Sequence, residues 1–310
     1  MISTSNITKY YDAKPAVRDV NLFVPAGETC ALTGPNGAGK TTLLKMLAGL
    51  LRPTSGQIEV GGIEIGVEPK RLHKLVGYMP DTFGLYDELT VRQFLDYFAH
   101  AQNVEADKVN KRIESVLELT NLTSKIDAGV GTLSRGMRQR LVIAKTLLHA
   151  PQVLLLDEPA SGLDPLARVE LRNLIKQLGA LGTTMIVSSH ILTELADFST
   201  SVVIMEQGRV IRAGKIDDLI SKLSGGTSVR IEMLDTFSAA TMAGYLQEQK
   251  QLKSVQVNGA TIDCTFTGDR AALANLHREL VTDHVGVVSF YERQLTMEDV
   301  FMAVGTRKVS

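Results

Sequence analysis

A glycine-rich segment, GPNGAGKT at Gly34–Thr41, has the residue types and spacing of a phosphate-binding loop. It follows an apolar stretch, Thr29–Thr33, that predicts a strand, and it opens a second apolar stretch, Thr41–Leu50, that predicts a helix. Glycines let backbone N–H groups converge on phosphate oxygens, and the helix N-terminus adds a partial positive charge. An accidental glycine-rich turn is the alternative, but it would not explain this order of strand, loop and helix.

Within this loop, Lys40 is expected to reach the β- and γ-phosphates of a nucleotide, and the Thr41 hydroxyl is expected to bind Mg²⁺. The other residues that we expect to contact the nucleotide here are Gly34, Pro35, Asn36, Gly37, Ala38, Gly39 and Thr42.

A second group of reactive side chains follows the apolar run VLLL at Val153–Leu156, which predicts a buried strand. The strand ends at Asp157 and Glu158, and ligands of open α/β sheets bind at the carboxyl ends of strands. Asp157 can hold Mg²⁺ directly or through water, and Glu158 can orient and deprotonate an attacking water. An acidic loop start is common by itself, but the two motifs together favour nucleotide hydrolysis over binding alone.

Three further motifs surround this strand. LSRGM at Leu133–Met137 precedes it, and SGLD at Ser161–Asp164 and SSH at Ser188–His190 follow it. In this order the motifs resemble the ATP-binding cassette (ABC) ATPases, from Met1 to about Leu219. The resemblance implies ATP and Mg²⁺ as ligands and ATP hydrolysis as the activity. A P-loop kinase or GTPase would not account for LSRGM or for the setting of His190.

The resemblance implies that the active site is shared by two protomers, in a homodimer or in a heterodimer with another ABC subunit. In the family, Ser134 and Gly136 would contact the γ-phosphate bound to the other protomer, and a predicted helix, Arg135–His149, suits this because its first N–H groups are free to bind an anion. Asp164 resembles the residue that joins the two sites. An N-cap of the following helix is an equally good reading of Asp164.

The resemblance also gives roles to His190, Tyr11 and Val17. His190 would contact the γ-phosphate and the water, although a histidine taken alone is more often structural. Tyr11 looks like the aromatic residue that stacks on adenine, with Val17 against the ribose. Tyr10 could take that role instead, and both tyrosines could simply pack in a strand.

Two positions depart from the family pattern. Asp81 stands where most members have glutamine; a carboxylate binds Mg²⁺ more strongly but repels the γ-phosphate, so we expect a Mg²⁺-dependent coupling residue. Arg135 stands where glycine is commoner; it either pairs with phosphate or is a solvated residue at the helix start. Members with these variants, and with an ending like LTMEDVFM at Leu295–Met302, are frequent among exporter-type systems.

The elements that must position these residues predict an α/β fold. Alternating segments near the N-terminus, SNITKYY, VNLFV and QIEVGGIEI, are typical of antiparallel strands, whereas VLLL and TMIV at Thr184–Val187 are typical of parallel strands covered on both faces. Between about 85 and 149 the apolar residues recur every three or four positions, as in helices. We therefore expect a P-loop ABC cassette over residues 1–222, with an antiparallel flank and an inserted helical subdomain.

A Gly/Ser break, SGGT at Ser224–Thr227, separates this cassette from a second pattern of elements. Its order, β-α-β-β-α-β, predicts a small ferredoxin-like α+β domain over residues 227–305. Thr296 and Asp299 form a capping pair that predicts a last short helix through Phe301. The domain contains no phosphate motif, so we expect a regulatory, dimer-stabilising or partner-docking role.

Composition limits the remaining possibilities. Among 310 residues, 33 Lys and Arg nearly balance 34 Asp and Glu, so there is no global positive field and no nucleic-acid partner is expected. The two cysteines, Cys30 and Cys264, favour free thiols in a reducing cytosol. The N-terminus lacks the features of a signal peptide, and no apolar run is long enough to span a membrane.

These observations predict the cytoplasmic ATPase subunit of a transporter, peripherally attached to the inner face of a membrane through a separate permease. Thr82–Leu95 is the expected docking segment, although its apolar residues could equally serve only to pack the helical subdomain. The alternative function is a soluble ABC ATPase that acts as an ATP-driven clamp on a macromolecular assembly. Such proteins usually carry two cassettes or a long coiled coil, which this chain does not show.

Overall fold

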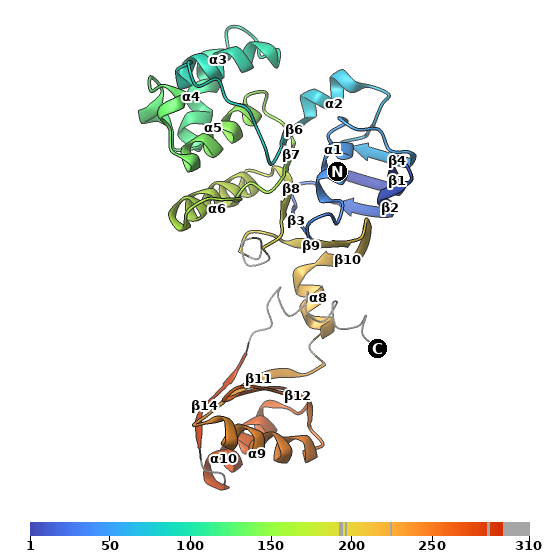
Figure 1. The fold of residues 1–310 in the computed structure, drawn as a ribbon, viewed down its shortest axis with the longest axis vertical. Helices are drawn as coiled ribbons and strands as arrows, with labels where there is room; N and C mark the ends of the chain where they lie inside the picture. The colour runs from blue at the N-terminus through green and yellow to red at the C-terminus, as the bar shows by residue number, and fades with distance from the viewer. Residues whose placement is uncertain (192–194, 196, 224, 284–285, 294–310) are drawn as a thin grey trace. The chain divides into compact units, whose positions relative to one another are not determined.

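The computed structural model describes residues 1–191, 195, 197–223, 225–283 and 286–293 (Figure 1). The chain divides into two compact units, Met1–Ile216 and Asp217–Ser310.

The first unit contains a six-stranded sheet in the order β10-β9-β3-β8-β7-β6, which is parallel except for the edge strand β10. Every residue of β3, β7 and β8 is buried, as expected of strands covered on both faces. The bounds are β3 Thr29–Thr33, β6 Val76–Met79, β7 Val153–Leu156, β8 Thr184–Ser189, β9 Ser201–Glu206 and β10 Arg209–Lys215.

An antiparallel sheet in the order β2-β1-β4-β5 lies beside helix α1 (Figure 1). Leu43, Leu44 and Leu47 of α1 share one apolar core with strands of both sheets, and this packing fixes the loop that precedes the helix. The bounds are β1 Ile2–Tyr11, β2 Lys14–Val24, α1 Lys40–Leu47, β4 Ser55–Val60 and β5 Ile63–Glu64.

The sequence predicted that helix α1 would extend to Leu50, but in the structure the helix ends at Leu47. Gly49 has φ +72°, its N–H donates to the carbonyl of Met46, and the Leu50 N–H donates to the carbonyl of Lys45. This pair of bonds is a Schellman motif, which ends a helix at a left-handed glycine.

The helical part follows β6 and returns to the sheet at β7. Helix α3 begins with a capping box between Thr90 and Gln93, and it buries Phe94 and Leu95. The bounds in this part and in the flanking helices are α2 Pro69–Leu75, α3 Val91–Ala101, α4 Val109–Leu119, η1 Thr123–Lys125, η2 Val130–Thr132, α5 Arg135–Leu147 and α6 Pro165–Ala180.

The second unit confirms the expected βαββαβ order. Its four antiparallel strands lie in the order β12-β13-β11-β14, and the apolar side of the sheet packs against helical residues such as Met242 and Leu280. The bounds are α8 Ile216–Leu223, β11 Thr227–Met233, α9 Thr236–Glu248, β12 Leu252–Asn258, β13 Thr261–Phe266, α10 Arg270–Asp283 and β14 Val287–Glu292. The helix expected at Thr296–Phe301 lies outside the described residues.

Candidate active site

The phosphate-binding loop lies between β3 and α1, where two glycines allow close approaches of the backbone. Gly34 has φ +151°, and a Cβ there would lie 2.1 Å from the carbonyl oxygen of Met205. Gly39 has φ +103°, and a Cβ there would lie 2.4 Å from the carbonyl oxygen of Ala16. A larger residue at either position would force the loop or its neighbour to shift, so this conformation requires glycine at both.

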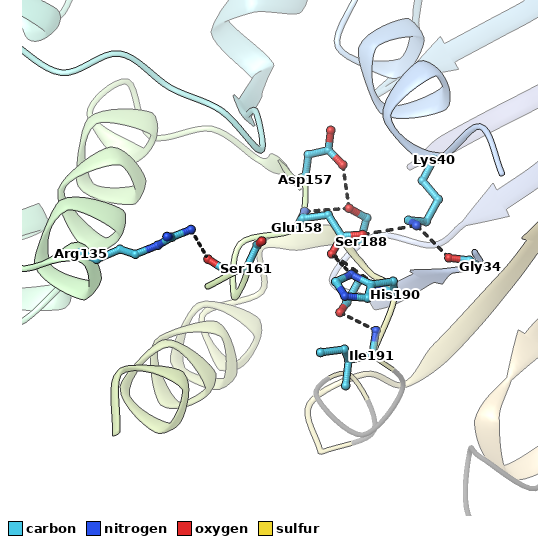
Figure 2. Close-up of polar contacts among 10 residues, drawn as sticks. Gly34, Lys40, Arg135, Asp157, Glu158, Ser161, Ser188, His190 and Ile191 are labelled. Carbon is cyan, nitrogen blue, oxygen red and sulfur yellow. Dashed lines mark hydrogen bonds and ion pairs between the residues drawn. The ribbon is translucent and has the colours of Figure 1, made fainter. Parts of the chain in front are cut away.

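Lys40, Glu158 and His190 form a connected polar group beside this loop (Figure 2). The Lys40 Nζ donates to the carbonyl of Gly34 at 2.8 Å and lies 3.3 Å from Glu158 Oε1. His190 Nδ1 donates to the other carboxylate oxygen, Glu158 Oε2, at 2.8 Å. The lysine and glutamate side chains are only 7% and 15% exposed. Glu158 therefore links a largely buried cation to the imidazole of His190.

A serine holds the two acidic residues at the end of β7. The Ser188 hydroxyl donates to Asp157 Oδ1 at 2.8 Å, and its oxygen accepts from the Glu158 N–H at 2.8 Å (Figure 2). Glu158 needs this support because its backbone is left-handed, with φ +48°, a conformation that costs of the order of 1 kcal/mol for such a residue. The sequence did not single out Ser188 for these contacts, although this residue begins the SSH motif.

Asp157 itself is fully buried. Its second carboxylate oxygen, Oδ2, lies 3.5 Å from the Tyr78 hydroxyl, at the limit of a hydrogen bond. Burial, followed by the negative charge of Asp157, raises the pKa of Tyr78, so that this hydroxyl remains a donor.

A cleft of about 480 Å³ brings together most of the predicted catalytic and phosphate-binding residues. Two residues that were not predicted, Ala16 and Ser161, also line it. The predicted residues in its wall are Asn36, Gly37, Ala38, Gly39, Lys40, Thr41, Thr42, Asp81, Glu158 and His190.

The structure does not bring Tyr11 or Val17 into the wall of this cleft. Tyr11 is 49% exposed, with the Lys9 ammonium 5.8 Å from its ring centroid, and Tyr10 is 46% exposed, so each tyrosine is about half accessible. Val17 is fully buried in the apolar core, and its neighbour Ala16 lines the cleft in its place.

The predicted interface residues lie at the N-termini of two helices, outside the wall of the cleft. The Ser134 hydroxyl caps α5 by accepting from the Met137 N–H at 3.3 Å. Asp164 caps α6 by accepting from the Ala167 N–H at 2.8 Å, which is the local role considered for it from the sequence. A Cβ on Gly136 would lie 2.7 Å from the Cβ of Ala167, so this glycine lets the two helix starts approach closely.

Asp81 follows β6 and lines the same cleft as the phosphate-binding loop. Burial, and then the negative charges of Asp157 and Glu158, raise the pKa of Asp81, whereas Arg135 and His190 act in the opposite direction. The negative charges of Asp157 and Glu158 thus disfavour the ionised form of the Asp81 carboxyl.

The fold and this cleft define a P-loop nucleotide-binding ATPase. The family model "ABC transporter" matches residues 17–161, and the model "ATP-binding protein DrrA1-3-like, C-terminal domain" matches residues 214–304. The linearmycin resistance ATP-binding protein LnrL of Bacillus subtilis is 31% identical over 304 residues, which is 97% of each chain. The Nod factor export ATP-binding protein I of Burkholderia lata is 33% identical over 99% of this chain and 98% of its own.

Solved structures agree with these matches. One, described as the ATP-binding subunit of an ABC transporter, is 31% identical with a TM-score of 0.65, and the match covers 72% of this chain and 93% of that one. Another, an ATP-binding cassette solved as a dimer in a post-hydrolysis state with ADP and Pi, is 26% identical with a TM-score of 0.63 over 70% and 99% of the two chains. The chain therefore belongs to the ATP-binding proteins of ABC transporters, and it is an ABC-type ATPase.

Within the part of the chain that the structure describes, no helix is long and apolar enough to cross a membrane.

Proposed function

We propose that this chain hydrolyses Mg²⁺-bound ATP in a dimer and thereby drives a separate permease in export. The observation that carries the proposal is the arrangement of Lys40, Glu158 and His190 in one cleft with the glycine loop. The direction of transport is inferred from relatives whose names refer to Nod factor export and to linearmycin resistance.

The loop binds the phosphates of ATP in this proposal. The backbone N–H groups of the loop and the N-terminus of α1 face the anion, and Lys40 exchanges the Glu158 carboxylate for the β- and γ-phosphates. Tyr11 stacks on the adenine, which suits its half-exposed ring.

The oxygen donors around the cleft fit Mg²⁺, which binds to one or two carboxylates together with substrate phosphates and water. The Thr41 hydroxyl and the Asp81 carboxylate would hold the ion from the wall of the cleft, and Asp157 would act from behind it. When bound, the ion neutralises the charge that develops on the phosphates.

Glu158 is the proposed general base. Its carboxylate orients the attacking water and takes a proton from it, and Ser188 keeps the glutamate backbone in place. His190 is already hydrogen-bonded to the same carboxylate, so that it can position the water and contact the γ-phosphate.

The dimer completes each site. The free N–H groups at the start of α5, beside Ser134 and Gly136, would contact the γ-phosphate on the partner subunit, and Asp164 would lie at the interface. A relative solved as a dimer supports this arrangement. Either a second copy of this chain or another ABC subunit would fit.

The proposed docking surface for the permease is an aromatic cluster in the helical part, which includes Tyr86 of the expected segment Thr82–Leu95 and extends beyond that segment to Tyr97 and Phe98. Tyr86 and Tyr97 are 49% and 54% exposed, their ring centroids lie 5.9 Å apart, and both contact Phe98. Exposed aromatic residues of this kind are common anchors in protein interfaces. Docking there would place the chain in the cytoplasm, at the inner face of the membrane.

The experiment is purification of the tagged chain from detergent-solubilised membranes, followed by measurement of phosphate release. We expect a polytopic membrane protein to copurify, and we expect turnover of ATP to require Mg²⁺. Salt-sensitive binding of nucleic acid without a membrane partner would instead favour the clamp function, and failure to bind ATP would contradict the whole proposal.

A further inference from the structure

Arg135 is a cation at the first position of helix α5, where the partial positive charge of the helix N-terminus disfavours it. Its side chain contacts the loop that follows Glu158, at Ser161, which lies 26 residues later in the chain. The Nη2 group donates to the carbonyl oxygen of Ser161 at 3.0 Å (Figure 2). This contact gives the arginine a partner that a solvated residue would not have.

Gly162 provides the surface on which the Arg135 guanidinium lies. This glycine has φ +67°, and a Cβ on it would lie 2.2 Å from Nη2 and 2.4 Å from Cζ of the arginine. The guanidinium therefore occupies the space that any other residue at position 162 would need for its side chain.

Two neighbouring residues of α5 extend this contact along the same segment. Gln139 Nε2 donates to the carbonyl of Pro159 at 2.6 Å in a buried position, and Gly136 lies against Ala167. Gln139 lies four residues after Arg135 and three after Gly136, so its side chain is on the same face of α5 as each of them. These contacts of α5 reach from the start of the segment, at Pro159, to the first turn of α6.

The held segment belongs to the active site. Ser161 lines the cleft, and its N–H donates to the carbonyl of Glu158 at 3.0 Å. We propose that Arg135 is a positioning residue for ATP hydrolysis, which holds the Ser161–Gly162 loop against α5 and thereby fixes the loop that begins at Glu158. The role rests on the active site proposed above, and it assigns to Arg135 a contact within its own chain and not a contact with phosphate.

The test compares Arg135→Ala, Arg135→Lys, Gly162→Ala and the double variant Arg135→Ala/Gly162→Ala. For each protein, ATP turnover is measured over a range of ATP concentrations and the melting temperature is recorded. The matched control is Gly182→Ala: Gly182 is also left-handed, with φ +83°, but no atom lies near enough to meet a Cβ, so this variant measures backbone strain alone.

We expect Arg135→Ala and Gly162→Ala each to lower kcat roughly tenfold, because small displacements of catalytic groups are costly, while KM for ATP changes less than about twofold. The double variant should be no slower than the slower single variant, since both remove one contact. Arg135→Lys should be intermediate, because an ammonium can donate to the carbonyl but cannot fill the space beside Gly162 that the larger guanidinium occupies.

The role is overturned if Arg135→Ala raises KM at unchanged kcat and lysine restores it, which would indicate a phosphate contact. It is also overturned if the two single effects add, or if Gly182→Ala slows turnover as much as Gly162→Ala. An unchanged kcat in Arg135→Ala would refute the positioning role of Arg135 but not the proposed function. Absence of ATP turnover in the wild-type chain would refute both.

Discussion

Replacing Glu158 by glutamine separates nucleotide binding from hydrolysis, because the change removes one charge and keeps the shape of the side chain. The carboxylate lies 3.3 Å from the Lys40 ammonium and 2.8 Å from His190 Nδ1. In the proposed mechanism the same carboxylate takes the proton of the attacking water. Without it, kcat should fall by about 100-fold or more, the range measured for the loss of a general base.

The same substitution should strengthen ATP binding. Coulomb's law with an effective dielectric constant of about 20 gives an attraction of about 5 kcal/mol between Lys40 and Glu158 at 3.3 Å. Desolvation of the two ions cancels most of this, which leaves a net interaction of the order of 1 kcal/mol. ATP competes with Glu158 for Lys40, and the γ-phosphate is repelled by the carboxylate. We therefore expect the Kd for ATP to fall roughly fivefold.

The assay has three parts: calorimetric titration with Mg²⁺ and ATP, phosphate release under saturating ATP, and size-exclusion chromatography with and without ATP. We expect tighter binding, very slow release and an ATP-dependent dimer. Glu114→Gln is the matched control, since Glu114 is an exposed residue of α4 and the change removes the same charge. Wild-type turnover in Glu158→Gln would require another base, and weaker ATP binding would refute the competition for Lys40.

Three other changes test separate parts of the site. Lys40→Ala should lower turnover by about 100-fold, because it removes a donor to the phosphates, and wild-type kinetics would contradict the role of the loop. Asp81→Gln should raise the Mg²⁺ concentration for half-maximal turnover roughly fivefold, about 1 kcal/mol for one charged ligand, and an unchanged requirement for Mg²⁺ would exclude Asp81 as a ligand. Ending the chain after Leu223 should leave ATP binding intact, since the cleft lies in the first unit; loss of soluble protein would argue against a separate domain.

The sequence predicted those helices and strands whose burial is evident from their own pattern of apolar residues. Strands β3 and β7 have the bounds expected from continuous apolar runs, because strands covered on both faces need apolar residues on both faces. The order of strands and helices along the C-terminal unit was predicted in the same way, from alternating and helical apolar patterns. The end of α1 was misjudged, since Gly49 ends the helix through backbone bonds that the apolar pattern alone does not reveal.

The site residues also differ in how well the sequence predicted their positions. Lys40, Thr41 and Glu158 lie in the cleft as expected because a motif fixes them to the end of a strand or the start of a helix. Val17 was expected to face the nucleotide, but the alternation of β2 turns it into the core and leaves Ala16 at the cleft. A shift of one residue along a strand reverses the face, and a motif-based expectation cannot detect it.

Ser188 shows why the remaining contacts require a structure. A serine near the end of an apolar strand is unremarkable in sequence, and its partners Asp157 and Glu158 lie about thirty positions earlier. Only the parallel pairing of β7 with β8 brings the serine beside both acidic residues. There its one hydroxyl donates to one carboxylate and accepts from the next backbone N–H, which supports the left-handed conformation of Glu158. The catalytic geometry thus depends on strand register as much as on the motifs that it aligns.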